Sequence, residues 1–147
     1  MARRWRDGSG SLIVPRDEGG EAPTAAPLVL PLEIAASYRA RTRGLLGRDS
    51  IAGAMLLSPA SGVHTFGMRI PIDVAYLDRH LTVLAVRTMP PGRVGLPRLR
   101  ARHVLEAEAG VMVGWGLRAG VRVSVEAEGD ADGVRDPGGT GGADGSG

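Results

Sequence analysis

Two residue types that can carry acid–base chemistry stand in the most apolar, strand-like stretch of the chain, residues 63–78, VHTFGMRIPIDVAYLD. A histidine beside a carboxylate can act as a general base or orient a ligand, so His64 and Asp73 are the first candidates. The alternative for His64 is a core histidine that is hydrogen-bonded to the backbone, and both interpretations stay open.

Asp73 needs partners if it is buried, because an ionised carboxylate in an apolar strand must accept hydrogen bonds from charged or backbone donors. The candidate donors are Arg43, Arg69 and His64. We therefore expect Asp73 to be a buried anchor in an ion pair that ties a helix to a sheet, with a functional role as the alternative. Met68 either lines a cleft with these residues or fills a gap in a core that has few aromatic side chains.

The composition excludes several kinds of chemistry. The chain has no cysteine and no lysine, which rules out disulfides, thiolate metal sites, cysteine nucleophiles and lysine Schiff bases. His64, His80 and His103 lack the i, i+2 or i, i+4 spacing of metal ligands, so neither a metal nor another cofactor is expected. Neither a G-x-S-x-G elbow nor a P-loop occurs, which argues against hydrolases and nucleotide-binding proteins.

Arg98, Arg100 and Arg102 recur at every second residue in LPRLRARH. On a strand they would face one way and could meet phosphates, which makes polyanion binding a minor alternative. Aromatic residues make up only 3% of the chain, however, and nucleic-acid binding usually needs stacking aromatics. Charged edge strands also serve to prevent aggregation, so a nucleic-acid partner is not expected.

Short elements must position these residues. Ser37 is expected to cap a short helix over residues 38–46 that ends at Gly47, and Pro31 suggests an edge or a bulge in the first strand. Residues 111–117 could form a second helical turn. Seven segments are strand-like: 28–37, 54–58, 62–66, 72–78, 81–89, 103–109 and 120–127. Many short strands with one or two short helices predict a mainly β fold, a compact antiparallel barrel or sandwich.

Composition divides the chain into three parts. Residues 1–27 mix Gly, Pro and charges without periodicity, and residues 127–147 are rich in Gly and Asp, so both are predicted to be disordered. A single domain is expected over residues 28–126, where thirteen arginines face seven acidic residues. The acidic tail is expected to be a solubilising appendage, with screening of a basic groove as the alternative.

No window of the sequence approaches the roughly 18 apolar residues of a membrane span, and the start lacks the apolar run of about seven residues or more that a secretory signal needs. We therefore expect a soluble, cytoplasmic protein without a membrane partner. The oligomeric state stays open.

Five short motifs occur here in the order found in the bacterial domain-of-unknown-function family 192, and the chain resembles its HTFGMR-containing branch. The motifs are RTRGLLGR at 41–48, AMLL-SP at 54–59, VHTFGMRIPIDVAYLD at 63–78, HVLE at 103–106 and GLRAG at 116–120. The resemblance implies a compact mainly β domain with a short helix near its start, and it supplies no activity. It also adds Glu106 to the candidates, whereas the alternation of HVLEAEA places Glu108 on a solvated strand face.

Two classes of function follow. The first is a non-catalytic binding or accessory module for a small polar or anionic ligand or a peptide. Its candidate ligand-binding residues are Arg43, His64, Met68, Asp73 and Glu106. The second is an enzyme that uses His64 with Asp73 or Glu106 as acid–base groups. The first is favoured because no complete nucleophile or metal set can be assembled, and no catalytic residue is assigned.

Overall fold

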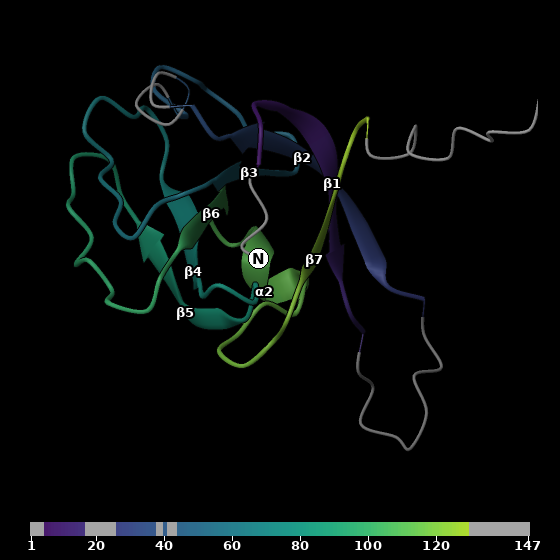
Figure 1. The fold of residues 1–147 in the computed structure, drawn as a ribbon. Coiled ribbons are helices and arrows are strands. Elements are labelled where there is room, and N and C mark those ends of the chain that lie inside the picture. Colours follow the sequence, from purple (N-terminus) through teal and green to yellow (C-terminus); the bar gives the residue numbers. More distant parts are fainter. Residues whose placement is uncertain (1–4, 17–25, 38–39, 41–43, 130–147) are drawn as a thin grey trace, which may run out of the picture.

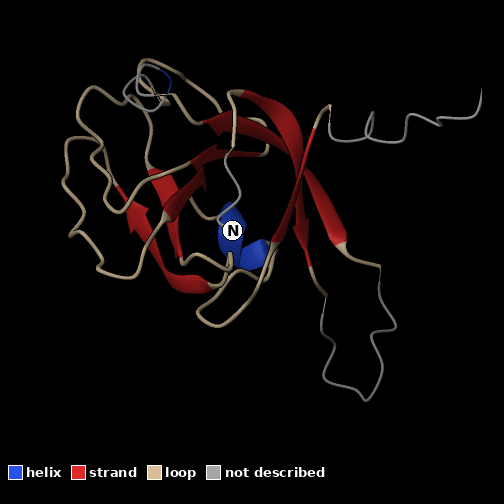
Figure 2. Cartoon of the chain, in the orientation of Figure 1, coloured by secondary structure: helices blue, strands red, loops and turns tan. Residues whose placement is uncertain are grey.

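Seven strands form one strongly curled sheet in the computed structural model, which describes residues 5–16, 26–37, 40 and 44–129 (Figure 1). The strands are β1 (Gly8–Val14), β2 (Leu28–Ala35), β3 (Ala54–Leu57), β4 (Ile72–Leu77), β5 (Val83–Met89), β6 (His103–Glu108) and β7 (Ser124–Ala127). Their order across the sheet is β5-β4-β6-β3-β2-β1-β7. The short helix α2 (Val111–Gly114) lies against the sheet, and nearly all other regular structure is strand (Figure 2).

The prediction of a mainly β fold is confirmed, with one difference in topology. β2 and β3 run parallel, whereas every other neighbouring pair is antiparallel. The sheet is therefore mixed, and it is not closed into a barrel. Its two ends nevertheless approach each other, because the amide of Val83 donates to the carbonyl of Val121 at 2.8 Å and Val123 donates to Leu81 at 3.0 Å.

The central strands are buried on both faces, so each face carries its own apolar cluster. The α2 face is the side covered by Met112 of the helix, and Leu56, Ala75 and Leu105 point into it. The loop face is the opposite side, which Leu45 and Met68 cover from the connecting loops. Sheet residues in that second cluster are Met55, Ile72, Val74, Tyr76, Met89 and Val104. Two residues adjacent along a strand therefore belong to different clusters.

The domain begins earlier than the sequence predicted. Residues 1–27 were expected to be disordered, yet β1 lies inside the sheet and pairs with β2 on one side and with β7 on the other. Leu12 and Val14 of β1 are fully buried in the core. Residues 1–4 and 17–25 of the N-terminal segment lie outside the described residues, as does the tail beyond Gly129.

The two helix predictions have different outcomes. Most of the predicted helix over residues 38–46 lies outside the described residues. The expected cap is present, because the hydroxyl oxygen of Ser37 accepts a hydrogen bond from the amide of Ala40 at 3.1 Å. Residues 111–117 do contain a helical turn, which is α2. No helix among the described residues is long and apolar enough to cross a membrane.

Two strand predictions need correction. Pro31 does not mark an edge, since β2 lies between β1 and β3. Proline is tolerated there because the ladder to β3 begins only at Leu32, so residue 31 needs no amide hydrogen on that side. The predicted strand over residues 62–66 is reduced to one isolated bridge between His64 and Val94.

Candidate functional site

Glu106 occupies the centre of the loop face. It lies on β6, the middle strand of the buried part of the sheet, where it pairs with Met55 of β3 on one side and Val74 of β4 on the other. Both neighbours belong to the apolar cluster of that face. Cross-strand pairs place side chains of one face about 5 Å apart, so the carboxyl group stands in an almost wholly apolar layer.

The carboxyl group of Glu106 is buried with incomplete hydrogen bonding. The residue is 3% exposed, and its Oε2 atom has no hydrogen-bond partner among the described residues. Burial raises the pKa of Glu106 to about 7, because the charged form loses its hydration. A buried polar atom without a partner is rare and calls for an explanation such as a bound molecule or a catalytic role.

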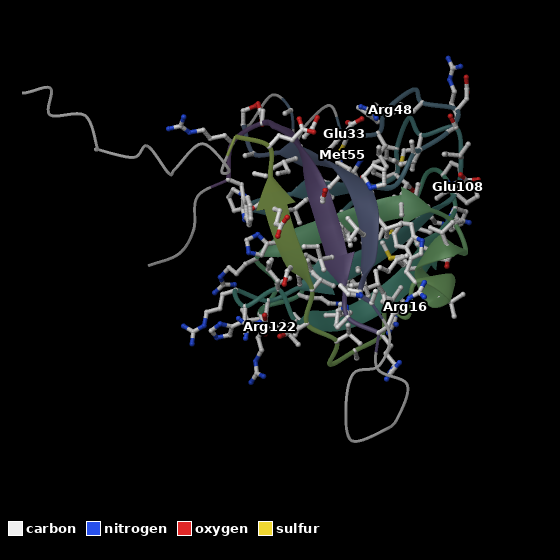
Figure 3. All side chains as sticks on the ribbon, turned by 90° about the vertical axis from the view of Figure 1, so that its right-hand side faces the viewer. Arg16, Glu33, Arg48, Met55, Glu108 and Arg122 are labelled. Atoms are coloured by element: carbon white, nitrogen blue, oxygen red, sulfur yellow. The ribbon has the colours of Figure 1, made fainter. Side chains whose placement is uncertain are left out.

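An ion pair borders this part of the loop face. Glu33 of β2 is paired with Met55, and its carboxylate accepts two hydrogen bonds from the guanidinium of Arg48 at 2.9 and 2.8 Å (Figure 3). The hydrogen bond from Arg48 lowers the pKa of Glu33. The two side chains are partly exposed, so the pair contributes little stability, but it fixes the segment that follows Leu45 over the sheet.

The segment 63–70 covers the loop face from the other side. Thr65 is its fixed point, since its hydroxyl donates to the carbonyl of Pro90 at 2.7 Å and accepts from the amide of Arg93 at 2.8 Å. Thr65 is fully buried, so His64 and Phe66 beside it point outward. The rings of His64 and Phe66 stack with centroids 5.6 Å apart. His64 is therefore an exposed loop residue and not a core histidine.

Asp73 lies on the opposite face of the sheet from Glu106, against α2. Its Oδ1 atom accepts a hydrogen bond from the hydroxyl of Thr88 at 2.6 Å, and Oδ2 accepts from the amides of Gly110 and Met112 at 2.9 and 3.1 Å. Asp73 is buried and anchored, as expected, but among the described residues its partners carry no charge, so the expected ion pair is not observed there. Asp73 holds the start of α2 to the sheet through backbone amides and a hydroxyl, as an N-terminal cap does.

None of the three expected donors is seen to bind Asp73: Arg69 and His64 lie elsewhere, and Arg43 is not among the described residues. Arg69 is exposed and forms a long ion pair with Asp49 at 3.4 Å. His64 is exposed on the segment that covers the other face, and among the described residues no hydrogen bond joins it to Asp73 or Glu106. Of the five candidates, Met68 and Glu106 thus lie on the loop face, whereas Asp73 lies on the α2 face.

One polar contact was missed by the sequence analysis. The hydroxyl of Ser58, just after β3, lies 2.6 Å from Nδ1 of His103 at the start of β6. Burial lowers the pKa of His103, the charge of Asp78 opposes that shift, and Arg102 adds to it. The amides of Ser58 and Ala60 already donate to backbone carbonyls, so they offer no oxyanion site for a serine nucleophile. The contact ties β3 to β6. Ser58 and His103 belong to two separate motifs, AMLL-SP and HVLE, and nothing in either motif indicates that they pair.

The arginine ladder that was considered as a minor alternative does not form. β6 begins only at His103, so Arg98, Arg100 and Arg102 lie in the preceding turn and not on a strand. The guanidinium of Arg98 lies over the ring of Tyr76, 4.9 Å from its centroid, and Arg102 donates to the carbonyls of two neighbouring residues. Within the described part of the chain, no group of three or more His, Asp or Glu residues could hold a metal ion.

Gly95 fixes the loop between β5 and β6 against the loop face. A Cβ atom at this position would lie 2.5 Å from the hydroxyl oxygen of Tyr76 and 2.9 Å from a methyl carbon of Val63. We expect Gly95→Ala to lower the free energy of unfolding by about 1–3 kcal/mol through overpacking. Gly62→Ala is the control, since its Cβ would make only ordinary contacts of 3.8 Å or more. Equal urea midpoints for the two variants would contradict the close contact.

Comparison with known proteins gives a family and no activity. The family model for DUF192, described as Uncharacterized ACR, matches residues 22–125. UPF0127 proteins of Pyrococcus horikoshii and Pyrococcus abyssi are each 31% identical over 85 residues. The alignment covers 54% of this chain and 74% or 73% of the two relatives. The resemblance inferred from the motifs is thereby confirmed at the level of the family.

Two crystal structures share the fold. A proposed transcription regulator from Sinorhizobium meliloti 1021 superimposes with a TM-score of 0.66 at 18% identity, covering 81% of this chain and 95% of the other. A protein of unknown function from Novosphingobium aromaticivorans gives 0.64 at 20% identity, with 78% and 83% covered. At such identities the likeness concerns the fold alone. Because the family model matches well over half of its length, this chain belongs to the uncharacterised DUF192 family.

Proposed function

We propose that this domain is a non-catalytic binding module for a small anionic or carbonyl-bearing ligand, or for such a group on a peptide, and that Glu106 is its central contact. The observation that supports the proposal is the buried Oε2 atom without a partner among the described residues. A ligand oxygen that accepts a hydrogen bond from the protonated carboxyl group would satisfy that atom.

The pKa of about 7 favours an acceptor ligand over a cationic one. Below this pH the carboxyl group is mostly protonated and can donate a hydrogen bond to a carboxylate or a carbonyl oxygen. Above it, the ionised group would repel an anion. Met55 and Met68, which belong to the same cluster, supply adaptable apolar walls. Arg43 stays the proposed cationic partner of the ligand.

The test uses propionate and N-acetylalanine as anionic probes and propylamine as a cationic one. Binding is followed by the methyl resonances of Met55 and Met68 in ¹³C-methyl-methionine NMR spectra of the full chain. We expect the anionic probes to shift both resonances, with an affinity about tenfold weaker at about pH 8 than at about pH 6, because only the protonated carboxyl binds them.

Three variants separate the contributions. Glu106→Gln keeps a donor at every pH, so it should bind the anionic probes with little dependence on pH, whereas Glu106→Leu should not bind them. Glu108→Gln, an exposed change on the same strand, should behave as the wild type. The proposal fails if no probe shifts either methyl group, or if propylamine binds more tightly than the anions.

A further inference from the structure

Two loops at one side of the sheet carry four large apolar side chains that are exposed to solvent. Leu96 is 82% exposed and Leu99 is 95% exposed, both in the loop between β5 and β6. Val94 of the same loop is 63% exposed, and Phe66 of the loop between β3 and β4 is 53% exposed. We call these four residues the Leu96 surface. Figure 1 shows the loop between β5 and β6 projecting from the sheet at the left.

Backbone hydrogen bonds hold the two loops together in a fixed arrangement. The amide of Thr65 donates to the carbonyl of Arg93 at 2.7 Å, and the amide of Gly95 donates to the carbonyl of Val63 at 2.8 Å. The amide of Arg98 donates to the carbonyl of Ser61 at 3.1 Å. The two segments thus run side by side over several residues, so the surface is built by the fold and not by a single turn.

The same contacts turn the apolar side chains outward. A side chain at Gly95 would point toward the hydroxyl of Tyr76, so the neighbouring side chains of Val94 and Leu96 point away from the core. Val94 forms the bridge opposite His64, whose ring stacks on Phe66. Val94, Leu96 and Phe66 therefore share one outer side.

The two stretches of sequence that form this surface carry positive charges and no acidic residue. From Arg79 to Leu105 the chain contains no acidic residue, and its arginines there are Arg79, Arg87, Arg93, Arg98, Arg100 and Arg102. From Ser50 to Ile72 it likewise contains no acidic residue and one arginine, Arg69, which contacts Asp49. Arg93 and Arg100 are both exposed, and in the sequence they directly adjoin Val94 and Leu99.

We propose that the Leu96 surface docks this protein onto an anionic phospholipid bilayer, with Leu96 and Leu99 entering the interface and arginines contacting the lipid phosphates. Large exposed apolar patches rimmed by polar residues mark sites of protein or membrane interaction. Basic residues beside such a patch are attracted to anionic lipids. The apolar side chains are mostly aliphatic, which suits acyl chains better than stacking on nucleic-acid bases.

This inference departs from the expectation of no membrane partner. That expectation rested on the lack of a spanning segment in the sequence, and a surface-bound loop needs none. The Leu96 surface also lies on residues that the proposed ligand site does not use. Glu106→Leu should therefore leave vesicle binding unchanged, so the two proposals can fail separately.

The experiment measures co-sedimentation of the full chain with vesicles of phosphatidylcholine, with or without phosphatidylglycerol. We expect binding only to the vesicles that contain phosphatidylglycerol, weakened by added salt. The double change Leu96→Ser and Leu99→Ser should reduce the partition coefficient at least about tenfold, because the apolar contribution of two leucines is lost. The double change Arg93→Gln and Arg100→Gln should also reduce it.

Matched controls use side chains of the same kind elsewhere. Val113→Ser changes an exposed apolar residue on α2, and Arg16→Gln changes an exposed arginine after β1. Both should bind as the wild type, and thermal unfolding verifies that every variant is folded. The proposal is overturned if the wild type does not sediment with anionic vesicles, or if the leucine variant binds as well as the wild type. It is also overturned if a single-stranded RNA oligonucleotide competes fully, since that result indicates a general polyanion site.

Discussion

As the pH rises from about 4.5 to about 7, the free energy of unfolding of the wild type should fall by about 3 kcal/mol, and Glu106→Gln should abolish this fall. Below pH 4.5 this carboxyl is protonated in the folded and the unfolded chain, so it gives no pH dependence. Between the two pKa values the unfolded chain releases the proton while the folded chain keeps it, and stability falls. Above about pH 7 both states are ionised and the loss is complete.

The measurement is urea unfolding of the wild type and the variant at about pH 5 and about pH 8. The difference in unfolding free energy between the two pH values should be larger for the wild type than for Glu106→Gln, because glutamine has no charge to bury. Glu108→Gln should retain the wild-type dependence, since Glu108 is exposed. If Glu106→Gln also retains it, the buried carboxyl is ionised at neutral pH and the raised pKa is wrong.

Asp73→Ala should lower the free energy of unfolding by about 2–4 kcal/mol. The change leaves the hydroxyl of Thr88 and the amides of Gly110 and Met112 without their acceptor. Asp73→Asn should cost only about 1 kcal/mol, because the amide oxygen can accept from both backbone amides while its nitrogen donates to Thr88.

Asp49→Ala is the comparison for the loss of a carboxylate at the surface. Its ion pair with Arg69 is long and exposed, so the change should cost under about 0.5 kcal/mol. Chemical unfolding followed by far-ultraviolet circular dichroism gives all three values. Similar midpoints for Asp73→Ala and Asp49→Ala would show that Asp73 does not hold α2 to the sheet.

The sequence predicts the central strands well, because their apolar runs are long and rich in branched residues. β4 and β5 fall within the predicted segments 72–78 and 81–89, and β6 falls within 103–109. β1 was missed because its sequence, GSGSLIV, holds two glycines and two serines with low strand propensity. In the fold the glycine at position 10 is needed, since a Cβ there would collide with the backbone of Glu126 on β7, but the sequence alone does not reveal this contact.

The site was less predictable than the fold. The burial of Asp73 follows from its apolar neighbours in the sequence, but its partners do not. Thr88 stands opposite Asp73 only through the register of β5 against β4. Glu106 and Glu108 share one alternation pattern, yet only Glu106 is buried, because loops from distant parts of the chain cover the middle of that face. Such cover depends on tertiary contacts that a local pattern does not contain.

The place of β1 bears on where this domain can be cut. The family match starts at residue 22, after β1, although β1 lies between β2 and β7. A fragment that begins at Leu28 would leave β2 with a bare eight-residue edge and would deprive β7 of the strand with which it pairs. Long unpaired edges recruit strands from other molecules. A boundary drawn from sequence similarity alone would thus expose an unpaired strand edge that can act as a template for aggregation.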